Sequence, residues 1–196
     1  MIQVVINKTA VSPEIAKEHL LACSYDITCA IDRIDEARFS LSERILRKHK
    51  HNKEEALALI VHQVEATEHI QRKFWLPLDE MNHLTPLVYG VLAVHEFLNY
   101  DDWEDFSSAL YFYPDIIVAQ FETVLNMPEI AHCLRAAKKR SDELLEQYKG
   151  KDVSVIANVI NKDAAFCVQA NFFTAHRGRM VDKLYSLVVE HVALFP

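Results

Sequence analysis

One stretch decides the fold of this chain: residues 85–105, Thr-Pro-Leu-Val-Tyr-Gly-Val-Leu-Ala-Val-His-Glu-Phe-Leu-Asn-Tyr-Asp-Asp-Trp-Glu-Asp. Thr85 can cap a helix that begins at Pro86, because the first helical position does not use a backbone donor. Nearly every residue from Leu87 to Leu98 is apolar, so we predict a helix that is buried on most sides. The rest of the chain is then expected to pack around this helix.

Apolar residues recur with helical spacing on both sides of that stretch, separated by short connectors. Helix-start signals occur at Ser12-Pro13, Ser40-x-x-Glu43, Asn52-x-x-Glu55, Pro114, Pro128 and Asp152. We therefore predict an all-α fold, a single domain over residues 1–196 that forms a helical bundle or orthogonal array of about seven to eight helices. Only Met1–Ile6 has the character of an extended segment.

The apolar periodicity also predicts where individual helices continue. It favours one helix from Ser12 to Ile34, another from Asn52 to about Trp75, and a third from Asp152 to Ala170. Gly178 is expected to interrupt the helical pattern before the last helix.

Composition and charge exclude several classes of function. The formal charge of −7 disfavours general nucleic-acid binding, which draws on a basic surface. Three glycines among 196 residues argue against a Gly-rich phosphate loop. No apolar run approaches the roughly 18–20 residues of a spanning helix, so we expect no membrane insertion.

The cysteines and the N-terminus bear on the compartment. Cys23, Cys29, Cys133 and Cys167 show no Cys-x-x-Cys spacing and lie in apolar helical stretches, which favours buried free thiols over disulfides. Met1–Lys8 lacks the basic start and the long apolar region of a signal peptide. We therefore expect a cytoplasmic protein.

Ionisable side chains on predicted apolar faces are the first candidates for a binding site. They are Glu68, His95, Asp163 and His191. Two carboxylates and two imidazoles from four helices could hold Zn, Mn or Fe in a bundle core, or could exchange a proton. The alternative is structural: each bonds a backbone carbonyl, a tyrosine or a buried water.

The acidic cluster Asp101-Asp102-Trp103-Glu104-Asp105 is the second candidate. It resembles the aspartate-rich motif of class I prenyltransferases and terpene synthases, which also follows a buried helix. The resemblance covers about five residues and implies that Asp101, Asp102 and Asp105 bind Mg²⁺ ions that hold a substrate diphosphate. The alternative is a helix N-cap with first-turn acids that complement the helix dipole.

The aromatic run Tyr111-Phe112-Tyr113 lies either in the core or at an interface. Helical bundles often self-associate, and a twofold homodimer is the commonest closed form. We therefore predict a binding or regulatory protein that contacts a protein partner or holds a small ligand between helices. The alternative is a metal-dependent helical enzyme that uses buried Glu, Asp and His or the aspartate-rich Mg²⁺ site; no cofactor is evident, and a divalent metal is the one expected under this alternative.

Overall fold

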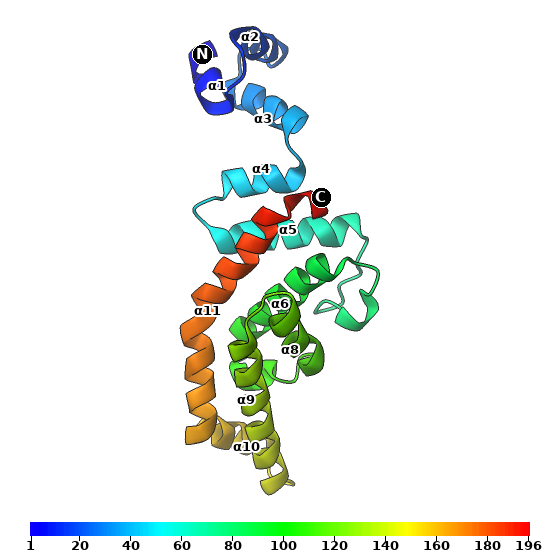
Figure 1. Ribbon diagram of the computed structural model, residues 1–196, viewed down its shortest axis with the longest axis vertical. Coiled ribbons are helices and arrows are strands. Elements are labelled where there is room, and N and C mark those ends of the chain that lie inside the picture. Colours follow the sequence, from blue (N-terminus) through cyan, green and yellow to red (C-terminus); the bar gives the residue numbers. More distant parts are fainter.

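The computed structural model describes all residues from Met1 to Pro196 and contains eleven α-helices, two short 3₁₀ helices and no strand (Figure 1). The predicted all-α class is confirmed. The helices are α1 (Ile2–Thr9), α2 (Pro13–Ala22), α3 (Ile27–Arg38), α4 (Leu41–Lys48), α5 (Lys53–Thr67), α6 (Pro86–Trp103), α7 (Phe106–Ala109), α8 (Pro114–Thr123), α9 (Pro128–Gln147), α10 (Val153–Ile160) and α11 (Ala164–Glu190), with 3₁₀ helices at Leu78–Glu80 and Val192–Leu194.

Helix α6 is the central helix that the sequence predicts. The Thr85 hydroxyl accepts the backbone N–H of Val88 at 3.4 Å, and Pro86 occupies the first helical position. The helix is buried along most of its length and contacts α5, α7, α8 and α11. Its residues therefore face several different neighbours, and its C-terminal half carries most of the polar side chains discussed below.

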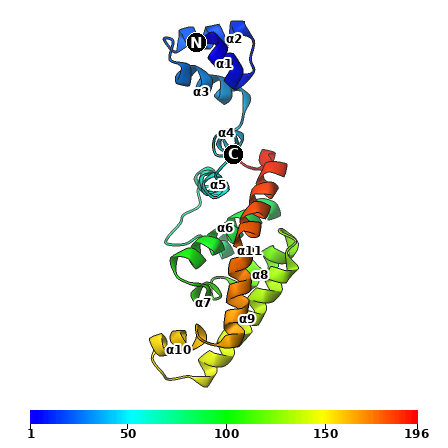
Figure 2. The ribbon, with the colours of Figure 1, turned by 90° about the vertical axis from the view of Figure 1, so that its left-hand side faces the viewer.

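The main body comprises α4 to α11 and contains one hydrophobic cluster of 40 buried residues. Helix α11 runs along the length of this body and packs against α9, while α8 packs between α6 and α9 (Figures 1 and 2). The C-terminus returns to α4, where the Pro196 carbonyl accepts the N–H of Ser42 at 2.7 Å. None of the helices has both the length and the hydropathy needed to cross a membrane.

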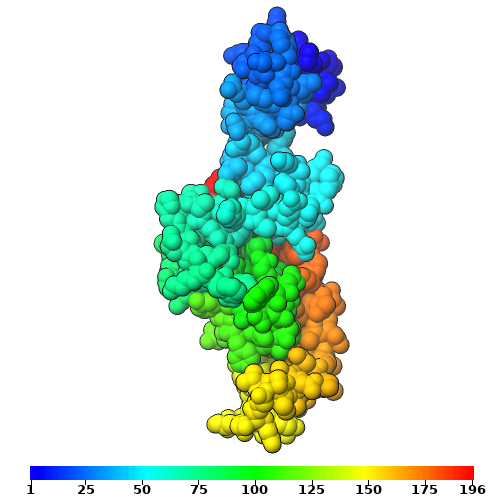
Figure 3. Space-filling view, turned by 180° about the vertical axis from the view of Figure 1, so that it is seen from behind, coloured from blue at the N-terminus to red at the C-terminus, as the bar shows by residue number.

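The first three helices form a separate N-terminal unit with a second, smaller hydrophobic cluster of six buried residues. The unit caps one end of the molecule, as the views from the side and from behind show (Figures 2 and 3). It meets the main body between α3 and α4, where Arg44 forms an ion pair with Glu36. The hydrophobic side chains thus divide at about Ser40, although the sequence shows no linker there.

The prediction of four free thiols is wrong for two of them. Cys23 and Cys29 form a disulfide between α2 and α3, with Cα atoms 5.8 Å apart. The turn between α2 and α3 brings the two cysteines together. In the single helix that the sequence predicts, their side chains would be too far apart to bond. Cys133 and Cys167 are free thiols, so the prediction of free thiols holds for these two cysteines only.

Several predicted helix boundaries are also wrong. The expected first helix breaks at Ser24 and Tyr25, both of which have positive φ, and the Asp26 side chain caps α3. Helix α5 ends at Thr67, followed by His69 with φ of 53°. Met1–Ile6 is helical rather than extended.

The C-terminal part of the chain differs as well. A turn at residues 161–163 divides the expected helix into α10 and α11, and the Asp163 side chain caps α11. Gly178 does not interrupt α11, which continues through it to Glu190. The structure has eleven α-helices instead of the expected seven or eight, because two expected helices are each divided and the N-terminal segment is also helical.

Candidate functional site

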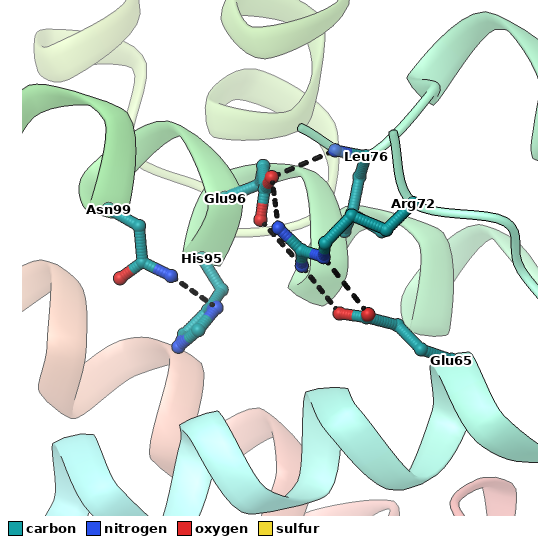
Figure 4. A network of polar contacts seen from close by, with 6 residues as sticks. All are labelled: Glu65, Arg72, Leu76, His95, Glu96 and Asn99. Carbon is teal, nitrogen blue, oxygen red and sulfur yellow. Dashed lines mark hydrogen bonds and ion pairs between the residues drawn. The ribbon is translucent and has the colours of Figure 1, made fainter. Parts of the chain in front are cut away.

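The C-terminal half of α6 has two adjacent faces, one with a carboxylate and two aromatic side chains and the other with polar side chains. Glu96, Tyr100 and Trp103 lie at positions i, i+4 and i+7, and so share one face of the helix. His95, Asn99 and Asp102 have the same spacing and share the neighbouring face. The first face contacts the loop of residues 68–77, and the second faces α5 and α11 (Figure 4).

Glu96 ties the loop to α6. Its side chain is fully buried, and its Oε1 accepts the backbone N–H of Leu76 at 2.8 Å. Arg72 donates from Nη1 to Glu96 Oε1 at 2.7 Å and from Nη2 to Glu96 Oε2 at 3.1 Å. The same guanidinium donates to Glu65 on α5 at 2.6 and 3.1 Å (Figure 4). We call these four residues the Glu96 network.

The electrostatics of the Glu96 network depend on Arg72. Burial raises the pKa of Glu96, while the Leu76 N–H and the Arg72 guanidinium oppose that rise. The pKa of Arg72 is raised, chiefly by its hydrogen bonds to Glu65. One guanidinium therefore compensates two carboxylates, and loss of Arg72 would leave the buried Glu96 carboxylate with the Leu76 N–H alone. This arrangement fixes the course of the loop.

Four aromatic side chains meet where the loop lies on α6. Phe74 and Trp75 come from the loop, and Tyr100 and Trp103 from the face of α6 that carries Glu96. Ring centroids are 5.2 Å apart for Phe74 and Trp103, 4.6 Å for Trp75 and Tyr100, and 5.7 Å for Trp75 and Trp103. We call this group the aromatic surface, because Phe74 is 64% and Trp103 60% exposed.

The second face of α6 lines a cavity of about 270 Å³ between α5, α6 and α11. His95, Asn99, Asp102 and Arg177 contribute polar groups to its wall, with Glu54 and Glu55 of α5 opposite. His95 Nδ1 lies 3.3 Å from the Asn99 side-chain nitrogen, and its ring turns away from Glu96 toward the cavity (Figure 4). Burial lowers the pKa of His95 to about 4, so the imidazole is neutral near pH 7.

The three aspartates of the predicted magnesium motif do not share one role. Arg177 of α11 donates to Asp101 at 3.2 Å and also to Asp102. Burial raises the pKa of Asp101 to about 6, although Arg177 opposes this. Asp105 instead caps α7, accepting the N–H of Ser108 and the hydroxyl of Ser107, each at 2.7 Å. The helix cap is the alternative that the sequence left open.

The four polar residues predicted to face inward have separate surroundings. Glu68 lies at the end of α5 with its carboxylate 3.8 Å from His83, and His191 is exposed at the end of α11. Asp163 accepts Arg140 at 2.7 and 3.0 Å, which lowers the pKa of Asp163 to about 2. Only His95 lines the cavity, and no group of three or more His, Cys, Asp or Glu is placed to hold a metal ion.

The aromatic run before α8 has mixed surroundings. Phe112 is buried, and Tyr113 donates its hydroxyl to Asp79 at 2.9 Å. Tyr111 is partly exposed, but its hydroxyl bonds Ser141 at 2.8 Å and Asp142 at 3.0 Å of α9. These residues mainly join elements of the main body.

The largest cavity, of about 520 Å³, lies elsewhere, between α7, α8 and α9. Its apolar wall includes Phe97, Leu110, Ile117 and Leu134, and charged side chains of both signs surround it. None of the site residues predicted from the sequence lines it.

Sequence reasoning missed the residues that organise the first face of α6. The sequence predicts a helix through to about Trp75, which would contain Arg72, Phe74 and Trp75, whereas α5 ends at Thr67 and all three residues lie in the loop that follows. One signal was present: Glu96 is a carboxylate within an otherwise apolar stretch, and a buried carboxylate requires a partner. The partner itself could not be located without the course of the loop.

Comparison with known proteins identifies the family of the main body. Residues 40–193 match the family model of the YfbN C-terminal domain, a range that begins at the cap of α4 and covers the main body. The chain is 34% identical over 146 residues to "Uncharacterized protein YfbN" of Escherichia coli (strain K12), a match that covers 74% of this chain and 60% of that protein. No solved structure matches. The chain therefore belongs to the YfbN C-terminal domain family.

Proposed function

We propose that this protein is a binding module that holds a protein partner on the aromatic surface formed by Phe74, Trp75, Tyr100 and Trp103. The observation that carries the proposal is the exposure of Phe74 and Trp103, at 64% and 60%, while their rings contact one another. Exposed neighbouring aromatic rings are costly in water and typical of interface centres, where Trp and Tyr contribute most to affinity.

The Glu96 network supports this proposal because it orders the surface before a partner arrives. Phe74 and Trp75 lie between Arg72 and Leu76, both of which bond Glu96 directly. A loop fixed at both ends loses little conformational freedom on binding, so more of the contact energy appears as affinity. Trp75 also packs on Tyr100 and on buried Phe112, which holds its ring in place.

The chain offers a direct optical test. Its only two tryptophans, Trp75 and Trp103, both belong to the aromatic surface, so intrinsic fluorescence reports on this surface alone. Peptides would be selected from a displayed random library on the immobilised protein and titrated back in solution. We expect selected peptides to shift the tryptophan emission, and Phe74→Ala to weaken them at least about tenfold, as for a central interface aromatic.

Val168→Ala is the matched control, because Val168 is 63% exposed on α11, away from the aromatic surface. This variant should bind the selected peptides like wild type. Selection that yields no peptide, or peptides that bind Phe74→Ala and Trp103→Ala as tightly as wild type, would rule the proposal out. Circular dichroism of each variant establishes that it is folded.

A small ligand held between helices is the second candidate function, and the cavity beside His95 favours it. A neutral imidazole, the Asn99 amide and the Arg177–Asp102 pair surround one enclosed space with apolar walls. Such a combination is typical of small-molecule sites. A fragment library followed by imidazole ¹⁵N spectra tests it: a ligand should shift the His95 resonances, and a library that leaves them unmoved speaks against the site.

A further inference from the structure

We infer that the partner segment bound by the aromatic surface is cationic, with a basic side chain, best an arginine, placed over Phe74 and Trp103. The inference rests on the proposed function and specifies the chemistry of the partner. It starts from the carboxylates that surround the aromatic surface, which the binding proposal itself does not use.

Carboxylates lie on two sides of the aromatic surface. Glu104 and Asp105 follow Trp103 directly, and their charges add to the effect of burial in raising the pKa of Tyr100. On the other side, Tyr113 packs against Phe112, which in turn contacts Trp75.

The charges of Asp79 and Glu80 act on that second side. The pKa of Tyr113 is raised by burial, by its hydrogen bond to Asp79 and by the charges of Asp79 and Glu80. Tyr100 within the aromatic surface and Tyr113 beside it therefore both lie close to carboxylates, Glu104 and Asp105 for the first and Asp79 and Glu80 for the second.

The nearby cations do not cancel this potential. Arg72 is bound by Glu65 and Glu96, and Arg177 by Asp101 and Asp102. Lys73, beside Phe74 in the sequence, is the remaining lysine or arginine of the loop, against the four carboxylates of Asp79, Glu80, Glu104 and Asp105. Glu80 and Glu104 are exposed and take part in none of the ion pairs of the chain, so both are available to a partner.

Aromatic faces and free carboxylates together recognise a cation. A guanidinium stacks on an indole or phenyl face through the negative potential of the ring, and it can also donate two hydrogen bonds to a carboxylate such as Glu104. Arginine fits better than lysine, because its planar group stacks and is more weakly hydrated. The net charge of −7 also attracts a basic segment at long range and repels a polyanion.

The probe is a nonapeptide in which arginine and glycine alternate, titrated at about 0.15 M salt, where the screening length is about 8 Å. Citrulline in place of arginine gives a neutral peptide of the same shape, and glutamate gives an anionic one. We expect saturable quenching of tryptophan emission by the arginine peptide, binding at least about tenfold weaker for citrulline, and none for glutamate. Equal binding of the arginine and citrulline peptides would overturn the inference.

Substitutions of the carboxylates test whether they contribute to binding of the arginine peptide. Glu104→Gln and Glu80→Gln should each weaken the arginine peptide about threefold, as for exposed charge pairs, while Glu190→Gln at the far end of α11 should leave it unchanged. Peptides selected from the random library distinguish the two proposals. Selected sequences that need Trp103 but carry no excess of arginine or lysine overturn this inference and leave the proposed function standing, whereas a library that yields nothing removes both.

Discussion

At the scale of single residues, the main body depends on a charge in its interior. Glu96 is fully buried within an apolar helix, and three hydrogen-bond donors compensate it: two from Arg72 and one from the Leu76 backbone. A buried carboxylate with these partners fixes one arrangement of the loop. The cost of this specificity is sensitivity to substitution.

Glu96→Gln should lower the free energy of unfolding by about 1–2 kcal/mol, because a neutral amide is a weaker acceptor than the carboxylate for Arg72 and the Leu76 N–H, while Arg72 keeps its bonds to Glu65. Urea denaturation followed by tryptophan fluorescence measures the change. The matched control is Glu122→Gln, which breaks an exposed pair with Arg135 and should leave the midpoint unchanged. Similar midpoints for wild type and Glu96→Gln would contradict the structural role assigned to Glu96.

His95 should make stability depend on pH in a defined window. Its pKa falls from 6.5 to about 4 in the folded protein, so the unfolded chain binds the proton more readily between these values. Stability from this group is present above pH 6.5 and is lost as pH falls toward 4, by up to about 3 kcal/mol. Asp101 has the opposite effect over an overlapping pH range: because its pKa is raised to about 6, its contribution to stability increases as the pH falls.

The comparison with His95→Gln separates the two groups. Between pH 6.5 and 4, wild type should lose more stability than this variant, and the imidazole of His95 should titrate near pH 4 in NMR spectra. Parallel pH profiles of stability for the two proteins would show that folding does not lower the pKa of His95.

The sequence could predict His95 but not the positions of Glu68, Asp163 and His191. His95 lies in the middle of a long helix, where the periodicity has a known phase. The other three lie at helix ends, where one residue of error changes the face to which a side chain is assigned. The metal sites inferred from these residues and from Asp101, Asp102 and Asp105, like the homodimer, stay predictions.

At the scale of elements, most helix starts were predictable and most helix ends were not, although the starts of α3 and α11, capped by Asp26 and Asp163, were missed. Side chains that cap a start leave a local signature, as Ser12, Ser40, Asn52 and Thr85 did, and the structure confirms each of them. The ends of α2 and α5 are set instead by non-glycine residues with positive φ, whose conformation depends on tertiary contacts. The aromatic surface depends on one of these ends, so it could not be predicted.

Gly90 and Gly178 allow a matched test of helix packing. A Cβ on Gly90 would lie 2.8 Å from Val124 of α8, whereas a Cβ on Gly178 would meet nothing within 4 Å. We expect Gly90→Ala to destabilise the protein by about 1–3 kcal/mol, and Gly178→Ala to stabilise it by up to about 1 kcal/mol through helix propensity. Thermal unfolding measures both. A stabilising Gly90→Ala would mean that α6 and α8 are not in close contact.

At the scale of the whole molecule, two hydrophobic clusters meet near Ser40, where the family match also begins. The sequence predicts one domain, because no linker marks this position. The N-terminal unit has a hydrophobic cluster of only six buried residues and one disulfide, so we expect it to unfold before the main body.

Urea unfolding of the full chain can test this expectation with two probes. Far-UV circular dichroism reports on all helices, whereas tryptophan fluorescence reports only on the main body. The dichroism curve should show an additional transition at lower urea concentration. A reductant should move this transition to still lower urea, because loss of a short disulfide loop lowers the free energy of unfolding of the N-terminal unit by about 2 kcal/mol. A single transition that coincides for both probes and ignores the reductant would show one cooperative unit.

The central claim is that Glu96 holds the loop of residues 68–77 so that Phe74 and Trp103 form a ready binding surface. The most direct measurement is a fluorescence titration of one selected peptide into wild type, Glu96→Gln and Glu122→Gln at a temperature where all three are folded. The account predicts that Glu96→Gln binds at least about fivefold more weakly, because the loop must then be ordered on binding, and that Glu122→Gln binds like wild type. Equal affinity for wild type and Glu96→Gln would contradict it.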